Sequence, residues 1–122
     1  KIPKIINCDI FHFGSCLQYI DNWRLLLNQT CKLKPKYIIF SDLIAGNIKS
    51  FVTIQKFDKY KMPYRFYNIN QIISFIKEKG YNLLLRNNYQ VHFNGFPSLL
   101  PTKKFPKKNR LEYTSNLIFK KK

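Results

Sequence analysis

The sequence predicts an α/β fold, and two observations on the order of its apolar segments lead to that class. First, an apolar run with strand character at 5–13 is followed by a helical pattern and then by a second apolar run at 36–40. A strand–helix–strand crossover of this kind implies parallel strands joined by a right-handed connection. Second, a helical pattern at 69–79 precedes strand-like segments at 81–86 and 111–120. The predicted order is therefore β-α-β, a variable stretch, and then α-β-loop-β.

The first helix has a clear start, an apolar face and a clear end. Asp21 or Asn22 is expected to cap it, because short polar side chains accept hydrogen bonds from the first free amides of a helix. Pro35 prevents the helix from continuing into the second strand. The apolar face has helical spacing and consists of Trp23, Leu26, Leu27 and Cys31.

The second helix, Ile69–Lys79, has the stronger pattern. Asn68 is the expected N-cap, and Gln71 stands three residues later, as in a capping box. Tyr67 and Ile72 have the spacing of a hydrophobic staple across the first turn. Gly80 follows the last helical residue and is the expected left-handed terminator.

The segments between these elements are harder to assign. Residues 46–58 are interpreted as a short strand or an extended connection, and 58–67 as a loop rich in aromatic residues. Residues 87–110 form a long basic loop, a length that is usually functional or disordered. The chain, 1–122, suits a single domain or the C-terminal half of one.

Polar residues follow the second strand directly. Tyr37–Phe40 is a short β-branched and aromatic run, typical of a strand buried on both faces, and Ser41 and Asp42 come next. In an open parallel sheet, the residues just past the carboxyl end of a strand face the ligand crevice. Ser41 and Asp42 are therefore candidate functional residues, with a solvated strand terminus as the alternative for Asp42.

The net charge of +16 suggests an anionic partner. Lysines outnumber arginines and are spread along the chain, apart from groups at Lys103–Lys108 and Lys120–Lys122. The heavy use of Ile, Asn, Lys, Tyr and Phe also matches the codons of an AT-rich genome. A small nucleic-acid-binding module that uses exposed aromatics and the Lys-rich loop remains an alternative, and a solvated basic loop is the simpler interpretation.

The cysteines and histidines show no metal or disulfide pattern. Cys8, Cys16 and Cys31 are odd in number and contain no Cys-x-x-Cys pair, which argues against a disulfide framework and a zinc site. Cys8 lies in the first apolar run and is expected in the core. His12 and His92 do not stand at metal-ligand spacing. A reduced, cytoplasmic setting is the simplest fit, with no membrane span and no signal-peptide apolar core at the start.

Several short motifs, taken in order, resemble a known family. The chain resembles the C-terminal half of a class I S-adenosylmethionine-dependent methyltransferase, and more narrowly a family encoded with bacterial surface-polysaccharide genes. Each motif is weak alone, and their order and spacing over most of the chain carry the resemblance. The motifs are Phe13–Tyr19, Lys34–Asp42, Thr53–Gln55, Met62–Asn68, Gly80–Tyr81 and Ser115–Lys120.

The resemblance implies a partial Rossmann-like methyltransferase sheet. The strands at 5–13 and 36–40 would be the fourth and fifth of seven, and those at 81–86 and 111–120 would be the last two, paired as a hairpin with the final strand antiparallel. In such enzymes a glycine-rich turn in the N-terminal half holds S-adenosylmethionine. None of the four glycines here forms a Gly-x-Gly, so the main cofactor-binding motif is absent and the isolated chain is expected to be inactive.

The resemblance also implies roles for particular residues, with a sugar or glycan precursor as the acceptor. Ser15, Gln18 and Tyr19 would lie beside the cofactor, where Tyr19 offers an aromatic face to the sulfonium cation. His12 would be a general base, with a satisfied core histidine as the alternative. Asp42 and Ser41 would remove a proton or bind the acceptor. The acceptor side would include Gln55, which matches a family motif, and Tyr64 in the aromatic loop.

A half-sheet would expose the edge of its first parallel strand. An exposed edge invites pairing with another chain. We therefore expect pairing with an N-terminal half, formation of a homodimer or poor solubility. A third hypothesis follows from the same feature, namely a non-catalytic α/β remnant that acts through a partner chain.

Overall fold

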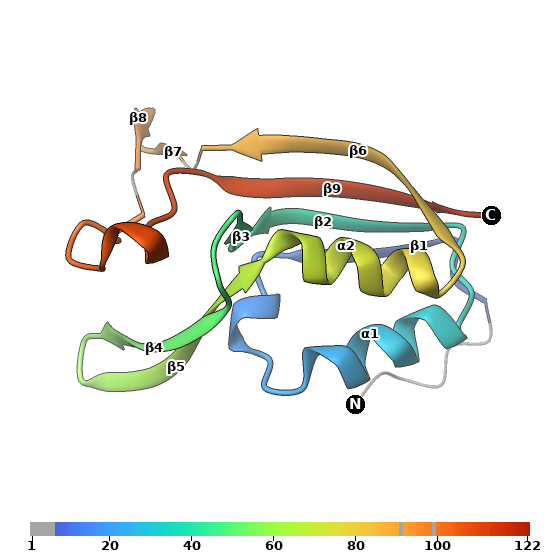
Figure 1. The fold of residues 1–122 in the computed structure, drawn as a ribbon, viewed down its shortest axis with the longest axis horizontal. Coiled ribbons are helices and arrows are strands. Elements are labelled where there is room, and N and C mark those ends of the chain that lie inside the picture. The colour runs from blue at the N-terminus through green and yellow to red at the C-terminus, as the bar shows by residue number, and fades with distance from the viewer. Residues whose placement is uncertain (1–6, 91, 99) are drawn as a thin grey trace.

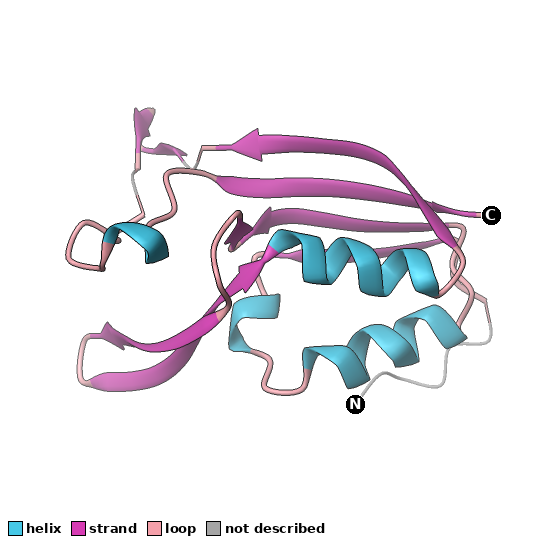
Figure 2. Cartoon of the chain, viewed as in Figure 1, coloured by secondary structure: helices cyan, strands magenta, loops and turns pink. Residues whose placement is uncertain are grey.

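The computed structural model describes residues 7–90, 92–98 and 100–122 of the 122-residue chain. The fold is mixed α/β, as predicted. A central sheet carries two helices, α1 (Trp23–Lys32) and α2 (Ile69–Glu78), on one of its faces, and a separate hairpin projects from one end (Figures 1 and 2). The C-terminus lies at the end of the sheet opposite the hairpin.

The central sheet contains strands from both halves of the sequence. Its order is β1 (Ile10–Gly14), β2 (Tyr37–Leu43), β9 (Thr114–Lys121) and β6 (Tyr81–Tyr89). The β1–β2 pair is parallel, as the crossover predicts. Strand β9 runs antiparallel to both of its neighbours, and β6 and β9 pair with each other as expected for the last two strands.

Alternation along the strands builds the core. Ile38 and Phe40 of β2 are buried on the helix-bearing side, while Ile39 between them is only half-buried. The ring of Phe40 stacks on Phe13 of β1 at 4.9 Å and meets Phe119 of β9 edge-on at 6.1 Å. Three adjacent strands are therefore joined through one aromatic cluster. Truncating such a buried aromatic residue to alanine typically costs about 3–5 kcal/mol of stability.

Helix α1 begins at the predicted cap. The Asn22 side chain accepts a hydrogen bond from the Leu25 amide at 3.0 Å, so Asn22 rather than Asp21 is the N-cap. Asp21 instead forms an ion pair with Arg65. The predicted apolar face packs on the sheet, with Trp23 and Leu27 buried and the other two members half-buried against the same cluster.

Helix α2 has the predicted Asn68 cap. The predicted reciprocal contact from Gln71 is replaced by a bridge through Ser50. Asn68 accepts hydrogen bonds from the amides of Asn70 and Gln71. The Gln71 side chain does not return to the Asn68 amide. Ser50 lies between them: its hydroxyl accepts from the Asn68 amide at 2.8 Å and donates to Gln71 Oε1 at 2.9 Å. Gly80 has φ +90°, as expected for a left-handed terminator.

The predicted aromatic loop at 58–67 was wrong. These residues belong to strand β5 (Tyr60–Asn68), which pairs antiparallel with β4 (Phe51–Phe57) around a tight turn at Asp58 and Lys59. Pro63 suggested a loop because proline cannot donate to a strand ladder. In the structure Pro63 faces Ile54 of β4 on one side. Its other side is unpaired among the described residues, since β3 (Ala45–Gly46) reaches only the last two residues of β5.

The long segment at 87–110 contains more structure than predicted. Strand β6 continues to Tyr89, and two short strands, β7 (His92–Phe93) and β8 (Phe96–Pro97), form a small hairpin. A 3-10 turn, η2 (Lys107–Asn109), precedes β9. A second apolar cluster anchors the segment, with Phe105 packing edge-on against Phe51 and Phe66 of the β4–β5 hairpin.

The first strand is shorter than predicted. Strand β1 begins at Ile10, and the expected start of the strand at 5–6 lies outside the described residues. Cys8 precedes the strand and is half-buried rather than part of the core, with its thiol donating to the Ile10 carbonyl at 3.0 Å.

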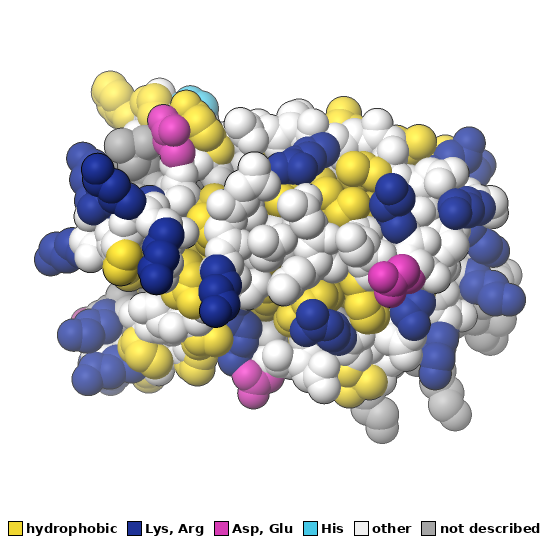
Figure 3. All heavy atoms as spheres, in the orientation of Figure 1, with side chains coloured by type: hydrophobic (Ala, Val, Ile, Leu, Met, Phe, Trp, Pro, Cys, Tyr) yellow, Lys and Arg dark blue, Asp and Glu magenta, His cyan; other side chains and the backbone are white. Residues whose placement is uncertain are grey.

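The face of the sheet opposite the helices is open among the described residues. Ile10 at the β1 edge is 56% exposed, and Leu84 and Leu85 of β6 are 57% and 40% exposed. Lys and Arg side chains gather at the two ends of the molecule in Figure 3, near the C-terminus and near the β4–β5 hairpin. In the described part of the chain, no helix has the length and apolarity needed to span a membrane.

Candidate functional site

The carboxyl ends of β1 and β2 bring the predicted site residues together. They form two sets of direct contacts, five residues around Asp42 and three around Tyr19, and the sets meet where Gln18 and Tyr19 are neighbours in the chain. They comprise His12, Ser15, Gln18, Tyr19, Ser41, Asp42, Gln55 and Tyr64. Their positions in the chain span more than fifty residues, so their convergence comes from the fold and not from one local motif.

His12 and Ser41 form a pair across the β1–β2 ladder. His12 Nε2 lies 2.7 Å from Ser41 Oγ, and both side chains belong to the sheet face opposite the helices. Gly14 makes room for this pair, because a Cβ at Gly14 would lie 3.3 Å from the His12 ring. His12 is exposed, so the alternative of a satisfied core histidine is wrong.

Asp42 is the centre of a hydrogen-bond network. Its carboxylate accepts hydrogen bonds from the hydroxyls of Ser15 and Thr114, the latter at 2.7 Å. Its backbone amide donates to Asn116 Oδ1 at 3.0 Å. The alternative of an idle, solvated strand terminus is therefore wrong for Asp42. The carboxylate ties the end of β2 to the turn after β1 and to the start of β9.

The backbone at this network is locally strained. Asp42 has φ +53° and Ser15 has φ +43°, in the left-handed region that residues other than glycine occupy uncommonly. Left-handed residues persist when surrounding contacts hold them, and they cluster at functional sites. Here the contacts are the Ser15–Asp42 hydrogen bond and the Ser15 amide, which donates to the Ser41 carbonyl at 3.0 Å.

Gln18 lies beneath the network with one unsatisfied atom. Its side chain is only 4% exposed, and its Nε2 donates to the Ser15 carbonyl at 2.8 Å. Its Oε1 is buried and accepts no hydrogen bond from the described residues. A buried acceptor without a partner costs about 1–3 kcal/mol, so this atom is suited to a donor group from a bound molecule.

Tyr19, Gln55 and Tyr64 extend the site onto the β4–β5 hairpin. The Tyr19 hydroxyl donates to Gln55 Oε1 at 3.0 Å, and its ring meets Tyr64 edge-on at 5.5 Å. Burial raises the pKa of the Tyr64 hydroxyl, with smaller contributions from Tyr19 and Asp42, so Tyr64 remains a neutral hydrogen-bonding group. The predicted aromatic loop thus contributes to the site as a strand.

The position of Tyr19 depends on a buried tyrosine. Tyr19 ends a 3-10 turn, η1 (Leu17–Tyr19), and the Tyr67 hydroxyl donates to the Leu17 carbonyl at 2.8 Å. Burial raises the pKa of Tyr67 to about 12, so this hydrogen bond persists well above neutral pH. The hairpin and the turn after β1 are therefore held as one unit.

A hollow of about 350 Å³ adjoins the hairpin side of the site. Gln55 and Tyr64 form one wall, and Leu100, Lys104 and Phe105 form the other. Its lining is mixed apolar and polar with two lysines, Lys56 and Lys104, which suits a small polar acceptor. Lys104 is the member of the predicted basic loop Lys103–Lys108 that lines this hollow.

Sequence reasoning missed Thr114 and Asn116 as site residues. No local signal marks them, because their place beside the carboxyl end of β2 depends on β9 pairing with that strand. Ser115, between them, points the other way and donates to the Ala45 carbonyl at 3.0 Å. Among the residues that the structure describes, no group of three His, Cys, Asp or Glu side chains could hold a metal ion.

No protein-family model matches this chain, and no curated protein sequence matches it. The assignment of function therefore rests on the geometry of the chain itself.

The residues present fit one end of S-adenosylmethionine, the cofactor that the resemblance implies. The unpaired Gln18 Oε1 suits the ammonium group of its amino-acid portion, and the 44% exposed Tyr19 ring suits its sulfonium cation. The chain has no Gly-x-Gly turn for the remainder of the molecule. The fit is therefore partial, and a second segment must complete any such site.

Proposed function

We propose that this chain is the carboxyl-terminal half of a methyltransferase sheet and contributes the acceptor side of its active site. The observation that carries the proposal is the strand order β1-β2-β9-β6, in which two parallel strands are followed by an antiparallel strand inserted before the sheet edge. The order agrees with what the resemblance to a class I S-adenosylmethionine-dependent methyltransferase implies, namely a parallel pair and a final antiparallel strand that pairs with the strand before it.

The free surfaces support the same proposal. Strand β1 has one paired side among the described residues, and the sheet carries helices on only one face. An N-terminal half would add parallel strands to the β1 edge, and its helices would cover Ile10 and the open face. The partner needed to complete the cofactor site would then also complete the core.

The residues of this chain divide into three tasks. Gln18 and Tyr19 would hold the amino-acid and sulfonium end of S-adenosylmethionine, which supplies a methyl group to a nucleophilic atom. His12 would accept the proton of the acceptor, because its ring is exposed and Ser41 fixes its orientation at 2.7 Å. Asp42 would position the turn at Ser15, since both of its carboxylate oxygens already accept hydrogen bonds.

The acceptor would occupy the hollow between Gln55, Tyr64 and Lys104. The amide, the phenol and the ammonium group are hydrogen-bonding partners for a hydroxyl-rich molecule, and the neighbouring rings provide apolar faces. A sugar or glycan precursor meets both conditions. A glycan that bears an anionic group would in addition pair with Lys104.

The test begins with the coding sequence immediately before Lys1. The proposal expects it to encode a strand, a Gly-x-Gly turn and a helix. The protein that includes this segment should bind S-adenosylhomocysteine in isothermal titration calorimetry. Gln18→Leu should weaken binding by roughly tenfold, the equivalent of one hydrogen bond to a charged group. The matched control is Gln90→Leu, at a half-buried position two residues before His92 and away from the candidate site.

Two outcomes would contradict the proposal. One is a reading frame that starts at Lys1 with no upstream unit and a product that binds no S-adenosylhomocysteine. The other is binding that Gln18→Leu and Gln90→Leu weaken equally. His12→Gln adds a separate readout, because it should lower methyl transfer while leaving the affinity for S-adenosylhomocysteine unchanged.

A further inference from the structure

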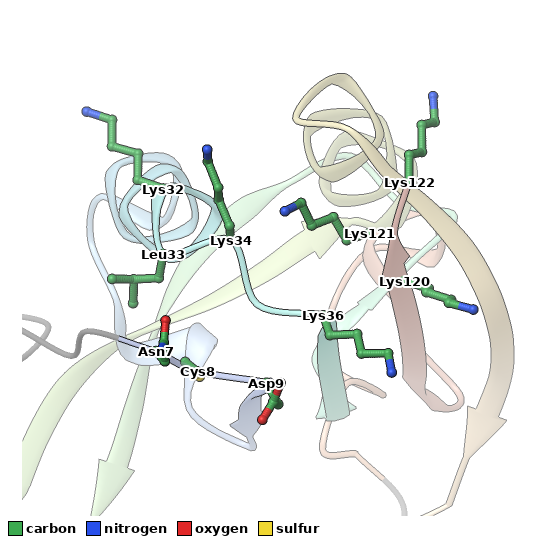
Figure 4. Close-up of a pocket in the computed structure, with 10 residues that line it drawn as sticks. All are labelled: Asn7, Cys8, Asp9, Lys32, Leu33, Lys34, Lys36, Lys120, Lys121 and Lys122. Carbon is green, nitrogen blue, oxygen red and sulfur yellow. The ribbon is translucent and has the colours of Figure 1, made fainter.

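Six lysines surround a hollow at the opposite end of the central sheet from the candidate site (Figure 4). The hollow has a volume of about 830 Å³ and lies where β1 and β2 begin and β9 ends. We call it the lysine hollow. Its basic residues are Lys32, Lys34, Lys36, Lys120, Lys121 and Lys122, and its other lining residues are Asn7, Cys8, Asp9 and Leu33.

Backbone hydrogen bonds hold the three lysine-bearing segments in place. The Lys121 amide donates to the Lys36 carbonyl at 2.9 Å, and the Lys122 amide donates to the Gly80 carbonyl at 3.0 Å. Lys34 has φ +54°, and its amide donates to the Cys31 carbonyl at 3.0 Å. Figure 4 shows the side chains of Lys34 and Lys121 reaching into the same gap, between the end of α1 and the end of β9.

The positive charge of the hollow is largely uncompensated. Among the described residues, Asp9 is the one acidic residue that lines it, against six lysines. None of these lysines forms an ion pair within the described residues, where Arg65 and Asp21 form the salt bridge. The carboxyl end of α1 favours nearby cations and accounts for Lys32 and Lys34. It does not account for the three consecutive lysines at the end of β9.

The side chains that line the lysine hollow indicate which class of anion it would bind. Lysine binds phosphate as a point charge, whereas arginine gives bidentate geometry, and none of the described lining residues is an arginine. The lining that the structure describes has no aromatic side chain either, so it offers no platform on which a nucleic-acid base could stack. We propose that the lysine hollow binds an anion that carries several phosphate groups in a row, recognised by charge. This site is separate from the proposed methyltransferase site and does not depend on it.

Isothermal titration of the protein with inorganic tripolyphosphate tests the proposal. The titration is run in a phosphate-free buffer at low and at moderate salt. The variant Lys34→Gln/Lys36→Gln/Lys121→Gln removes three charges from the hollow. The control Lys56→Gln/Lys59→Gln/Lys61→Gln removes the same number from the exposed β4–β5 hairpin. Binding should weaken by roughly tenfold or more in the hollow variant and by less than about twofold in the control.

A thermal-unfolding measurement provides an independent readout. Tripolyphosphate should raise the Tm of the wild-type and control proteins and leave that of the hollow variant unchanged, because a ligand stabilises only a fold that binds it. A twelve-nucleotide oligothymidylate is titrated in parallel. Weaker binding of the oligonucleotide than of tripolyphosphate would support a compact phosphate site.

Three results would overturn the proposal. Equal weakening in the hollow and control variants would mean that only net charge matters. An absence of tripolyphosphate binding at low salt would remove the site. Oligonucleotide binding without tripolyphosphate binding would mean that the lysines follow a nucleic-acid backbone and do not form a compact phosphate site. S-adenosylhomocysteine binding should be the same in both lysine variants, which separates this test from that of the methyltransferase proposal.

Discussion

At the scale of single residues, the two left-handed aspartates of this chain provide a matched comparison. Asp42 has φ +53° and three hydrogen bonds at the site, whereas Asp58 has φ +52° at an exposed hairpin turn. Asp58→Ala places alanine in a left-handed conformation without removing the site network, and it should lower the free energy of unfolding by about 1 kcal/mol. Asp42→Ala also leaves the Ser15 hydroxyl without its acceptor and the Thr114 hydroxyl with only the Tyr89 carbonyl, at 3.2 Å, so we expect a loss of about 2–4 kcal/mol in urea unfolding. Equal losses would show that the Asp42 network adds nothing to stability.

The buried hydroxyl of Tyr81 should make the stability of the fold decrease at alkaline pH. It is 1% exposed, its hydroxyl donates to the Pro35 carbonyl at 2.9 Å, and burial raises its pKa from 10.0 to about 12. Between these values the unfolded chain loses the proton more readily than the folded one, so the stability present below pH 10 decreases as the pH rises toward 12. Urea unfolding at pH 8 and pH 11 should show this decrease, and Tyr81→Phe should reduce it. A decrease of the same size in Tyr81→Phe would rule out Tyr81 as its source, leaving Tyr64 and Tyr67, whose pKa values burial also raises.

At the scale of elements, Ser50 links helix α2 to the start of β4. Its hydroxyl accepts from the Asn68 amide and donates to Gln71 Oε1, so one side chain joins both members of the interrupted capping box. Ser50→Ala should destabilise the fold by about 1–2 kcal/mol, the usual cost of losing a helix cap. The exposed Ser98→Ala should change stability by less than about 0.5 kcal/mol. A double-mutant cycle with Gln71→Ala measures the coupling, and additive losses would contradict the bridge.

The elements also show which features were predictable from local patterns. Helix α2 was predicted well because its Asn68 cap and its Gly80 terminator are both local signals. Strand β5 was missed because Met62 and Pro63 resemble a turn, and only the pairing of Pro63 with Ile54 in the hairpin reveals a strand. The contribution of Ser50 was invisible for the same reason, since it stands eighteen residues before the helix that it caps.

The candidate site shows the same limit. Ser41 and Asp42 could be proposed because a polar pair after an apolar strand is a local signal. Thr114 and Asn116 could not, because their role depends on β9 lying beside β2, a contact between residues more than seventy positions apart. The left-handed backbone at Ser15 likewise follows from contacts across the sheet, and its sequence gives no sign of it.

At the scale of the whole molecule, the open side of the sheet determines how the chain behaves in solution. Strand β1 has an unpaired edge among the described residues, and the exposed Ile10 lies on that edge. An unpaired edge beside apolar surface favours pairing with a second copy when no N-terminal half covers it. We expect the isolated chain to form dimers or larger species at high concentration.

Multi-angle light scattering over a range of concentrations measures this association. Ile10→Lys places a charge on the edge and should shift the protein toward monomer, because an edge lysine opposes strand addition. Val52→Lys is the control, since Val52 is 59% exposed on the separate β4–β5 hairpin and should leave association unchanged. A stable wild-type monomer at high concentration would contradict the open-edge argument. Equal effects of the two variants would assign any association to net charge rather than to β1.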